Sequence, residues 1–331
     1  MPAAPVENGP AHEPDTSDVA SSLVGVSEFG VVTMATDADS IIRACALSAS
    51  LQLHQPAWPR CIITTPDAVV PDGWFHHVIR FEQPEPYANH FRYLNKLVHP
   101  FVLSPFTRTL FLDDDTLVIR PFQTVLEANF LGHQVALNTR KDQADEPRPG
   151  TNHLDASVVC QELATSHCWN TYGGGHMYFE SISQFPELAA DAIDIAVNQP
   201  ELYERWSAQS IVSDELALLI AINQQHFEMP TIPDFVDALS LRLADSAHFS
   251  VRESTYRLPG RPWGEQIGDV AILHFCSSAK RSVTYARSIR QLTGMRQSFD
   301  MGWRGALRRV HHDALRLRRR LARGIPRGGT A

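Results

Sequence analysis

Three consecutive aspartates, Asp113 to Asp115, follow an apolar run in the stretch LFLDDDTLVIRPF. Two unit charges about 4 Å apart near a protein surface repel by roughly 4 kcal/mol, so something should offset this cost. Because alternate side chains of a strand point to opposite faces, we expect Asp113 and Asp115 to share a face and Asp114 to point away. Two carboxylates on one face suit a hard divalent cation such as Mg²⁺ or Mn²⁺. The alternative is a charged turn that follows a buried strand and binds nothing.

A second group of candidate residues lies in HFCSSAK, where His274 follows the apolar run VAIL and Lys280 comes six residues later. A histidine there can supply a third metal ligand, and the lysine can face the β-phosphate of a diphosphate. The alternative for His274 is a structural histidine at the end of a strand. Taken with the aspartates, the pattern favours a site for a metal ion and a diphosphate.

The composition is that of an ordinary globular chain. Its 331 residues are 44% hydrophobic and 20% charged, which predicts one large α/β domain. The net charge is −8, although residues 300–331 carry nine arginines against two acids, so the rest of the chain is strongly acidic. An acidic body argues against nucleic acid as a partner, whereas a diphosphate is compatible if a metal ion carries positive charge.

The cysteines and the first residues bear on the cellular compartment. The five cysteines are scattered and lack the spacing of a zinc site, which indicates reduced thiols in a cytoplasmic protein. No apolar run approaches 18 residues, and the start lacks the basic flank and apolar centre of a signal peptide. We expect residues 1–27 to be a disordered leader.

Short apolar runs alternate with segments of helical period from about Gly30 onwards, which predicts βαβ units in a mixed, mostly parallel sheet flanked by helices. The predicted strands are GVVTMAT, RCIITT, HHVIRF, RTLFLDD, QVALNT, GGHMYF, EMPTI and VAILHF, and the predicted helices lie in SIIRACALSASLQLH and around 91–104, 184–198 and 212–224. In such sheets ligands bind beyond the carboxyl ends of the strands, where Thr36, Asp37 and the aspartates fall. The segment from Lys141 to Asn170 is polar and lacks a sustained period, so we expect a long surface loop.

These motifs resemble those of a known family. FLDDDTL resembles the strand-end Asp-x-Asp-Thr of glycogenin-like and bacterial lipopolysaccharide glycosyltransferases (glycosyltransferase family 8), and HFCSSAK resembles their His-x-x-Gly-x-x-Lys element. Weaker likenesses follow in the family's order in VTMATDADS, YLNKLV, GGGHMYF and SDELALL, so that the resemblance covers roughly residues 28–282. Ser277 replaces the family's glycine, no Pro-Trp follows Lys280, and the glycines 173–175 replace Asn-Ser-Gly.

The resemblance implies a GT-A fold, Rossmann-like, over residues 28–298, and a role for each matching residue. Asp113, Asp115 and His274 would hold Mn²⁺ or Mg²⁺. The predicted donor-binding residues are Thr36 and Asp37 at the nucleoside and, at the diphosphate and sugar, Lys96, Asp114, Gly174, Gly175 and Lys280. The predicted catalytic residues are Asp214, Glu215 and Lys280. Acids at positions 214 and 215 are also favourable in the first turn of a helix, which is the alternative for them.

The resemblance further implies a metal-dependent glycosyltransferase that moves a hexose from a nucleoside-diphosphate sugar, UDP-linked, to an unknown acceptor with retention of configuration. One alternative is a haloacid-dehalogenase-type phosphatase, which also has an apolar strand and Asp-x-Asp. That pattern wants Thr or Val four residues after the first Asp, where this chain has Leu117. The other alternative is a catalytically silent protein that binds sugar nucleotides.

The segment 299–331 interleaves apolar residues with arginines at helical spacing. This pattern predicts a basic amphipathic helix that makes peripheral contact with the inner face of a membrane. The alternative is a helix that packs its leucines on the acidic domain. The sequence does not predict an oligomeric state.

Overall fold

A computed structural model of the chain describes residues 28–82, 95–137, 139–145, 154–171, 176–180, 185–206, 214–230, 236–258 and 270–297. The predicted leader, the predicted C-terminal helix, Gly174 and Gly175 lie outside these residues, so what the sequence indicates for them stays a prediction.

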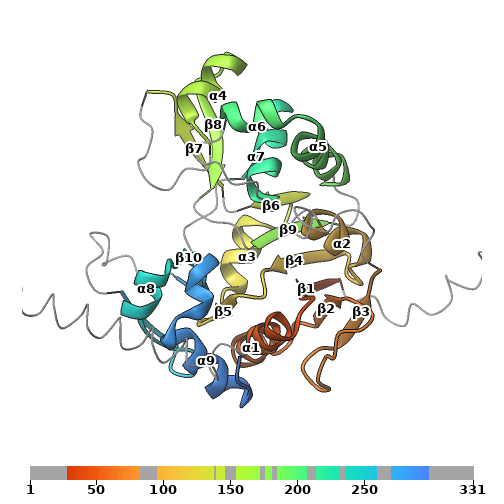
Figure 1. The fold of residues 1–331 in the computed structure, drawn as a ribbon, viewed down its shortest axis with the longest axis vertical. Coiled ribbons are helices and arrows are strands. Elements are labelled where there is room, and N and C mark those ends of the chain that lie inside the picture. The colour runs from red at the N-terminus through yellow and green to blue at the C-terminus, as the bar shows by residue number, and fades with distance from the viewer. Residues whose placement is uncertain are drawn as a thin grey trace, which may run out of the picture.

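A six-stranded sheet in the order β3-β2-β1-β4-β9-β6 forms the centre of the fold (Figure 1). Its strands are β1 (Phe29–Met34), β2 (Arg60–Thr64), β3 (His77–Arg80), β4 (Arg108–Leu112), β6 (Val135–Leu137) and β9 (His176–Glu180). The first four pair in parallel, and β9 runs antiparallel to both of its neighbours. The prediction of a mixed, mostly parallel sheet is confirmed.

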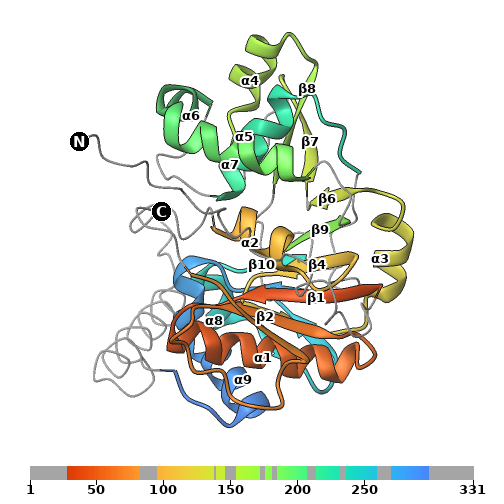
Figure 2. The ribbon, with the colours of Figure 1, turned by 90° about the vertical axis from the view of Figure 1, so that its right-hand side faces the viewer.

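Helices cover both faces of this sheet, which explains why its strands are continuously apolar. Figure 2 shows α1 (Ala38–His54) on one side and α2 (Asn95–Leu103) on the other. Adjacent residues of β1 serve different cores, because Val31 packs in one cluster with Leu47 of α1 while Val32 packs in another with Leu216. Leu216 belongs to α7 (Asp214–Gln224), which lies against α5 (Phe185–Asn198).

A smaller sheet in the order β10-β13-β5 connects distant parts of the chain. Its strands are β5 (Thr116–Val118), β10 (Val236–Ala238) and β13 (Ile272–His274). Strand β5 follows β4 after the three aspartates and pairs antiparallel with β13, so that Thr116 lies opposite His274. The short helix η3 (Ser277–Arg281) and the helix α9 (Val283–Thr293) come next. This pairing brings the two motifs singled out in the sequence together.

The prediction of a long surface loop between Lys141 and Asn170 is wrong. Its described part contains the end of β7 (Thr139–Gln143), all of α4 (Ala156–Leu163) and the start of β8 (His167–Thr171). Strands β7 and β8 pair antiparallel, and their polar residues are buried against one another: Asp142 binds Arg140 at 2.6 Å and accepts a hydrogen bond from Asn170. Helix α4 begins after Asp155, whose carboxylate accepts hydrogen bonds from two backbone N–H groups. Polar residues that pair with each other inside the fold give the same composition as a solvated loop.

The remaining predicted strands and helices agree with the structure except for EMPTI. No strand occurs in its described part, Glu228–Pro230, and the strand of this region is β10. The other elements are α3 (Gln123–Asn129), α6 (Pro200–Trp206), α8 (Leu241–Ser246), β11 (His248–Ser250) and β12 (Thr255–Arg257). Of the helices described, none combines the length and the apolar character needed to cross a lipid bilayer.

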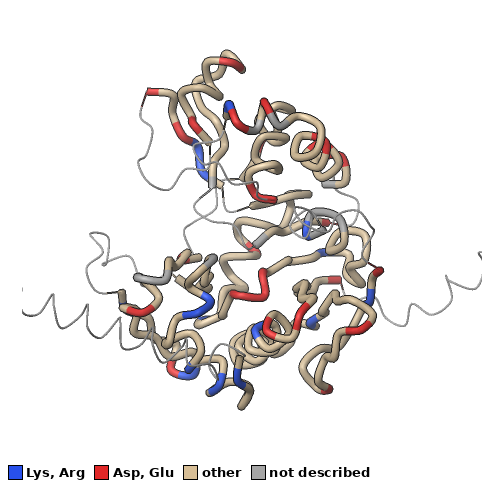
Figure 3. The backbone as a smooth tube through the Cα atoms, viewed as in Figure 1, with Lys and Arg blue, Asp and Glu red and all other residues tan. Residues whose placement is uncertain are grey.

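Acidic and basic residues are spread along the described backbone, over the sheet and over the helices beyond its edge, rather than gathered on one element (Figure 3). The local arrangement of charge therefore matters more than the net charge.

Candidate active site

The three aspartates lie in a tight turn between β4 and β5 rather than on a strand. The backbone N–H and the Oγ1 of Thr116 both donate to the carbonyl of Asp113, at 3.1 and 2.7 Å. The alternation of side chains along a strand is thus the wrong reason for the placement of Asp113 and Asp115. The turn brings these two carboxylates to one side and directs Asp114 towards α1, where it meets Arg43.

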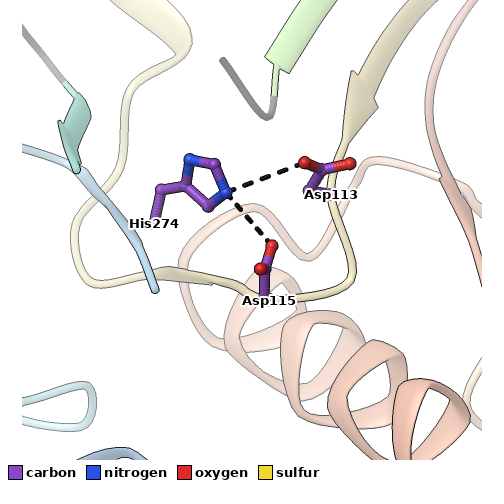
Figure 4. Close-up of side chains that lie close together, drawn as sticks. All are labelled: Asp113, Asp115 and His274. Carbon is purple, nitrogen blue, oxygen red and sulfur yellow. Dashed lines mark ion pairs between the residues drawn. The ribbon is translucent and has the colours of Figure 1, made fainter. Parts of the chain in front are cut away.

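Asp113, Asp115 and His274 form a compact cluster at the carboxyl end of the sheet (Figure 4). Nε2 of His274 lies 3.2 Å from Oδ1 of Asp115 and 3.7 Å from Oδ2 of Asp113. One ligand atom from each residue lies within 4.8 Å of the others. The side chains of Asp115 and His274 are almost fully buried, and that of Asp113 is 13% exposed. The three residues predicted as metal ligands thus lie together.

Two lysines border this cluster, one paired with each aspartate. Nζ of Lys96 lies 2.6 Å from Asp113, and Nζ of Lys280 lies 2.8 Å from Asp115. These ion pairs offset the repulsion between the aspartates even without a metal ion. The two carboxylates and the two ammonium groups cancel, so a divalent cation would make the group net positive, which suits an anionic diphosphate.

Burial and neighbouring charges shift the pKa values of Asp115 and His274. Burial alone would raise the pKa of Asp115, but His274 and Lys280 beside it hold that pKa below its usual range. Burial would likewise lower the pKa of His274, but Cys276 and Asp115 raise it well above the ordinary value. The raised pKa favours the imidazolium when no cation is present, and a metal ion bound through Nε2 would have to displace the proton on that nitrogen.

The donor set fits a hard divalent ion. Oδ1 of Asp115 is buried, and among the described residues its one neighbouring polar group is Nε2 of His274, at 3.2 Å. In an octahedral shell with bonds of about 2.1 Å, adjacent ligand atoms lie about 3 Å apart, which is close to the separation of these two residues. The other ring nitrogen, Nδ1, lies 3.3 Å from Sγ of Cys276. A second contact of this kind orients a histidine that binds metal through its free nitrogen.

Arg43 is a residue of the site region that sequence reasoning missed. Its guanidinium binds Oδ2 of Asp114 through Nη2 at 2.6 Å and through Nε at 2.7 Å. Both side chains are nearly buried, and the buried ring of Tyr285 from α9 lies beside them. The signal in the sequence is a single arginine inside SIIRACALSAS, a helix that is otherwise apolar or small. Because Asp114 faces α1, its described contacts are structural, and its predicted contact with a donor stays a prediction.

Asp214 is the first residue of α7 and belongs to the same electrostatic group. Burial, opposed by Lys96 and assisted by Asp113, raises the pKa of Asp214 to about 6. Glu215 follows it and is half-buried. The start of α7 thus places an acid near Lys96, the lysine that pairs with Asp113.

The raised pKa of Asp214 gives a prediction about stability. The unfolded chain loses this proton near pH 3.8 and the folded chain near pH 6, so Asp214 destabilises the fold increasingly from pH 4 to 6 and fully above pH 6. In chelator, Asp214→Asn should therefore be more stable than the wild type at pH 7.5, by about 1 to 2 kcal/mol after allowance for partial exposure. Urea unfolding at pH 7.5, 6.0 and 4.5 measures the difference, which should shrink as the pH falls. Asp67→Asn, in an exposed turn, is the control without this gain. An Asp214→Asn variant that is equally destabilised at every pH would contradict the raised pKa of Asp214.

The predicted nucleoside-binding residues lie at the carboxyl end of β1, next to the end of β4 in the sheet. Asp37 is the N-cap of α1, where its carboxylate accepts from the backbone N–H of Ser40 at 2.9 Å. In return, Oγ of Ser40 accepts a hydrogen bond from the backbone N–H of Asp37 at 2.9 Å, which completes a capping box. Thr36 and Asp37 are both exposed at this edge. Their contact with a nucleoside stays a prediction.

Comparison with known proteins finds likeness in structure. No protein-family model matches the sequence, and no curated protein matches it. The galactosyltransferase LgtC, solved with donor and acceptor sugar analogues, is similar over 83% of this chain and 99% of its own, with 13% identity and a TM-score of 0.47. The bifunctional glycosyltransferase WbbM is similar over 84% of this chain and 51% of its own, with 11% identity and a TM-score of 0.48. Mouse xyloside xylosyltransferase 1 is similar over 76% of this chain and 98% of its own, with 13% identity and a TM-score of 0.42.

These structures are glycosyltransferases, the class of enzyme that the sequence motifs resemble. At such low identity the likeness concerns the fold, and the chemistry has to be inferred from the side chains of the site.

Proposed function

We propose that the chain is a metal-dependent glycosyltransferase that moves a hexose from a nucleoside-diphosphate sugar, UDP-linked, to an acceptor whose identity is open. The observation that carries the proposal is the Asp113, Asp115 and His274 cluster, with a lysine paired to each aspartate. The type of donor and the retention of configuration rest on the sequence resemblance. The cytoplasmic location rests on the scattered cysteines, and the membrane contact of residues 299–331 rests on the helical spacing of their apolar residues and arginines.

Different residues of the site would hold the metal ion and contact the diphosphate. A divalent cation, Mn²⁺ or Mg²⁺, held by the three clustered residues would neutralise the charge that develops on the leaving diphosphate. Lys280 is 32% exposed, so its ammonium group can turn from Asp115 to a phosphate oxygen. Lys96 is placed in the same way beside Asp113.

The acids at the start of α7 would face the sugar. The bond from the anomeric carbon to the diphosphate breaks with its electron pair leaving on the phosphate oxygen, so positive charge develops on the sugar ring. With a pKa of about 6, Asp214 is mostly ionised at pH 7.5 and can stabilise that charge. Glu215 supplies a second carboxylate next to it in the helix.

A screen of nucleoside-diphosphate sugars with and without Mn²⁺ tests the proposal. We expect a UDP-hexose to raise the melting temperature of the full chain when Mn²⁺ is present, because ligand at 100 times its dissociation constant adds about 2.7 kcal/mol of stability. The same mixture should release UDP slowly by transfer to water, which needs no acceptor.

The possible results of the screen separate the alternatives. Binding without any release of UDP, also with sugars and glycolipids as acceptors, would favour the silent binding protein. Release of phosphate from p-nitrophenyl phosphate with no response to sugar nucleotides would favour the phosphatase. The variant Asp67→Asn, which changes an exposed turn, should behave as the wild type.

A further inference from the structure

A second pocket lies at the other end of α1 from the aspartates. It has a volume of about 200 Å³, and its walls include Gln52, Leu53, Arg60, Trp74, Arg252 and Leu292. At about 30 Å³ for each water molecule, this space would hold roughly six or seven waters, or a small organic molecule.

The pocket is separate from the candidate active site. Arg60 is the first residue of β2, and this strand runs parallel to β1, so the pocket lies at the amino end of the sheet. The aspartate turn follows the carboxyl end of β4. Along α1, nine residues separate Arg43 at the aspartates from Gln52 at the pocket, which corresponds to about 14 Å at 1.5 Å per residue.

In the part of the chain that the structure describes, Arg60 has no anionic partner. Arg60 is only 6% exposed, and its Nε and Nη1 atoms are buried without a hydrogen-bond partner among the described residues. Nη2 is not among these buried atoms, so it is the nitrogen through which Arg60 can reach an anion in the pocket. By contrast, Arg43 and Arg140 each bind an aspartate at 2.6 Å. An arginine cannot lose its proton to escape the cost of burial. A buried charge without a partner costs several kcal/mol, which binding of an anion would relieve.

The rest of the pocket favours an anion that carries an apolar group. Arg252, in the turn between β11 and β12, adds a second guanidinium, and no acid is among the described residues that line the space. Asp72 precedes the lining residue Gly73 but makes no ion pair with either arginine in the described structure. Trp74, Leu53 and Leu292 supply apolar walls. A bare inorganic ion would leave these walls in contact with water.

We propose that this pocket binds a small organic oxyanion, a carboxylate or a phosphate monoester, with its charged head at Arg60 and Arg252 and its apolar body against Trp74. Guanidinium groups bind carboxylates and phosphates alike through paired N–H donors, so the choice between these two head groups is made by experiment. The proposal does not depend on the glycosyltransferase function.

Benzoate and phenyl phosphate are suitable probes, with benzyl alcohol as the neutral analogue and inorganic phosphate as the bare ion. Titration calorimetry and thermal melting of the full chain in chelator should show binding of at least one aromatic anion, with a rise in melting temperature of about 2 °C or more at saturation. Benzyl alcohol and inorganic phosphate should bind at least 10-fold more weakly. Preference for benzoate or for phenyl phosphate identifies the head group.

Two variants localise the binding, and one serves as the control. Arg60→Gln and Arg252→Gln should each weaken the preferred anion at least 10-fold, whereas Arg257→Gln, on the exposed neighbouring strand β12, should leave it unchanged. Because Arg252 is exposed, its variant decides the question even if Arg60→Gln does not fold. Equal affinity for anions and benzyl alcohol, or unchanged anion affinity in Arg252→Gln, would overturn the proposal.

Discussion

Replacing Asp115 by asparagine is expected to lower metal-dependent turnover of the donor at least 100-fold, and Asp113→Asn should act in the same direction. Asp115 is the more buried of the two and contacts both His274 and Lys280, so its loss disturbs the metal site and the lysine that meets the diphosphate. Removing one group that stabilises charge in a transition state costs about 100- to 1,000-fold in rate.

The rate of UDP release at increasing Mn²⁺ concentration measures this effect. Loss of a ligand should lower kcat and raise the concentration of Mn²⁺ needed for half-maximal rate. Melting curves in chelator separate this from unfolding, because each variant weakens the ion pairs with a lysine and with His274 but keeps the turn made by Thr116. Asp67→Asn is the matched control for the change from carboxylate to amide. Variants that turn over donor as the wild type does, with the same response to Mn²⁺, would remove the metal assignment.

The parts of the site that follow strands could be predicted from the sequence. An apolar run that ends in polar residues marks a strand end, and parallel strands end at the same edge of a sheet, so the aspartates and Thr36 were expected there. His274 also follows such a run, and its pairing with Thr116 through β13 brings it to the cluster. Patterns of this kind depend only on residues that are neighbours in the chain, so they can be recognised in the sequence.

The partners of buried charges could not be predicted in this way. Arg43 and Asp114 are far apart in the chain, and neither helical nor strand periodicity records which carboxylate an arginine will meet. The same reason accounts for the error between Lys141 and Asn170, where Asn170 donates a hydrogen bond to Asp142 inside the fold, 28 residues away in the chain. The aspartate turn itself was missed because a turn and a short extended segment leave the same sequence signal after a strand.

Asp114→Asn is expected to destabilise the protein by about 3 to 5 kcal/mol, the usual effect of removing one partner from a buried ion pair. Arg43 would keep its charge in a site where its side chain is 12% exposed, beside the buried Tyr285. Asp113→Asn should lower the stability less. The side chain of Lys96 is 18% exposed, and Asp214 lies near it as a second carboxylate. Urea unfolding in chelator at pH 7.5 measures both changes.

A double variant shows whether the loss of stability comes from the unpaired charge of Arg43. Arg43→Met together with Asp114→Leu removes both charges and keeps apolar volume, so it should recover most of the stability that Asp114→Asn loses. If the double variant is as unstable as the single one, packing rather than charge explains the loss. If Asp114→Asn is as stable as the wild type, the pair does not anchor the turn. A loss of stability in Asp114→Asn that the double variant recovers would mean that the three adjacent carboxylates have different roles. Arg43 holds Asp114 to α1, and this leaves Asp113 and Asp115 to face the proposed metal ion and donor.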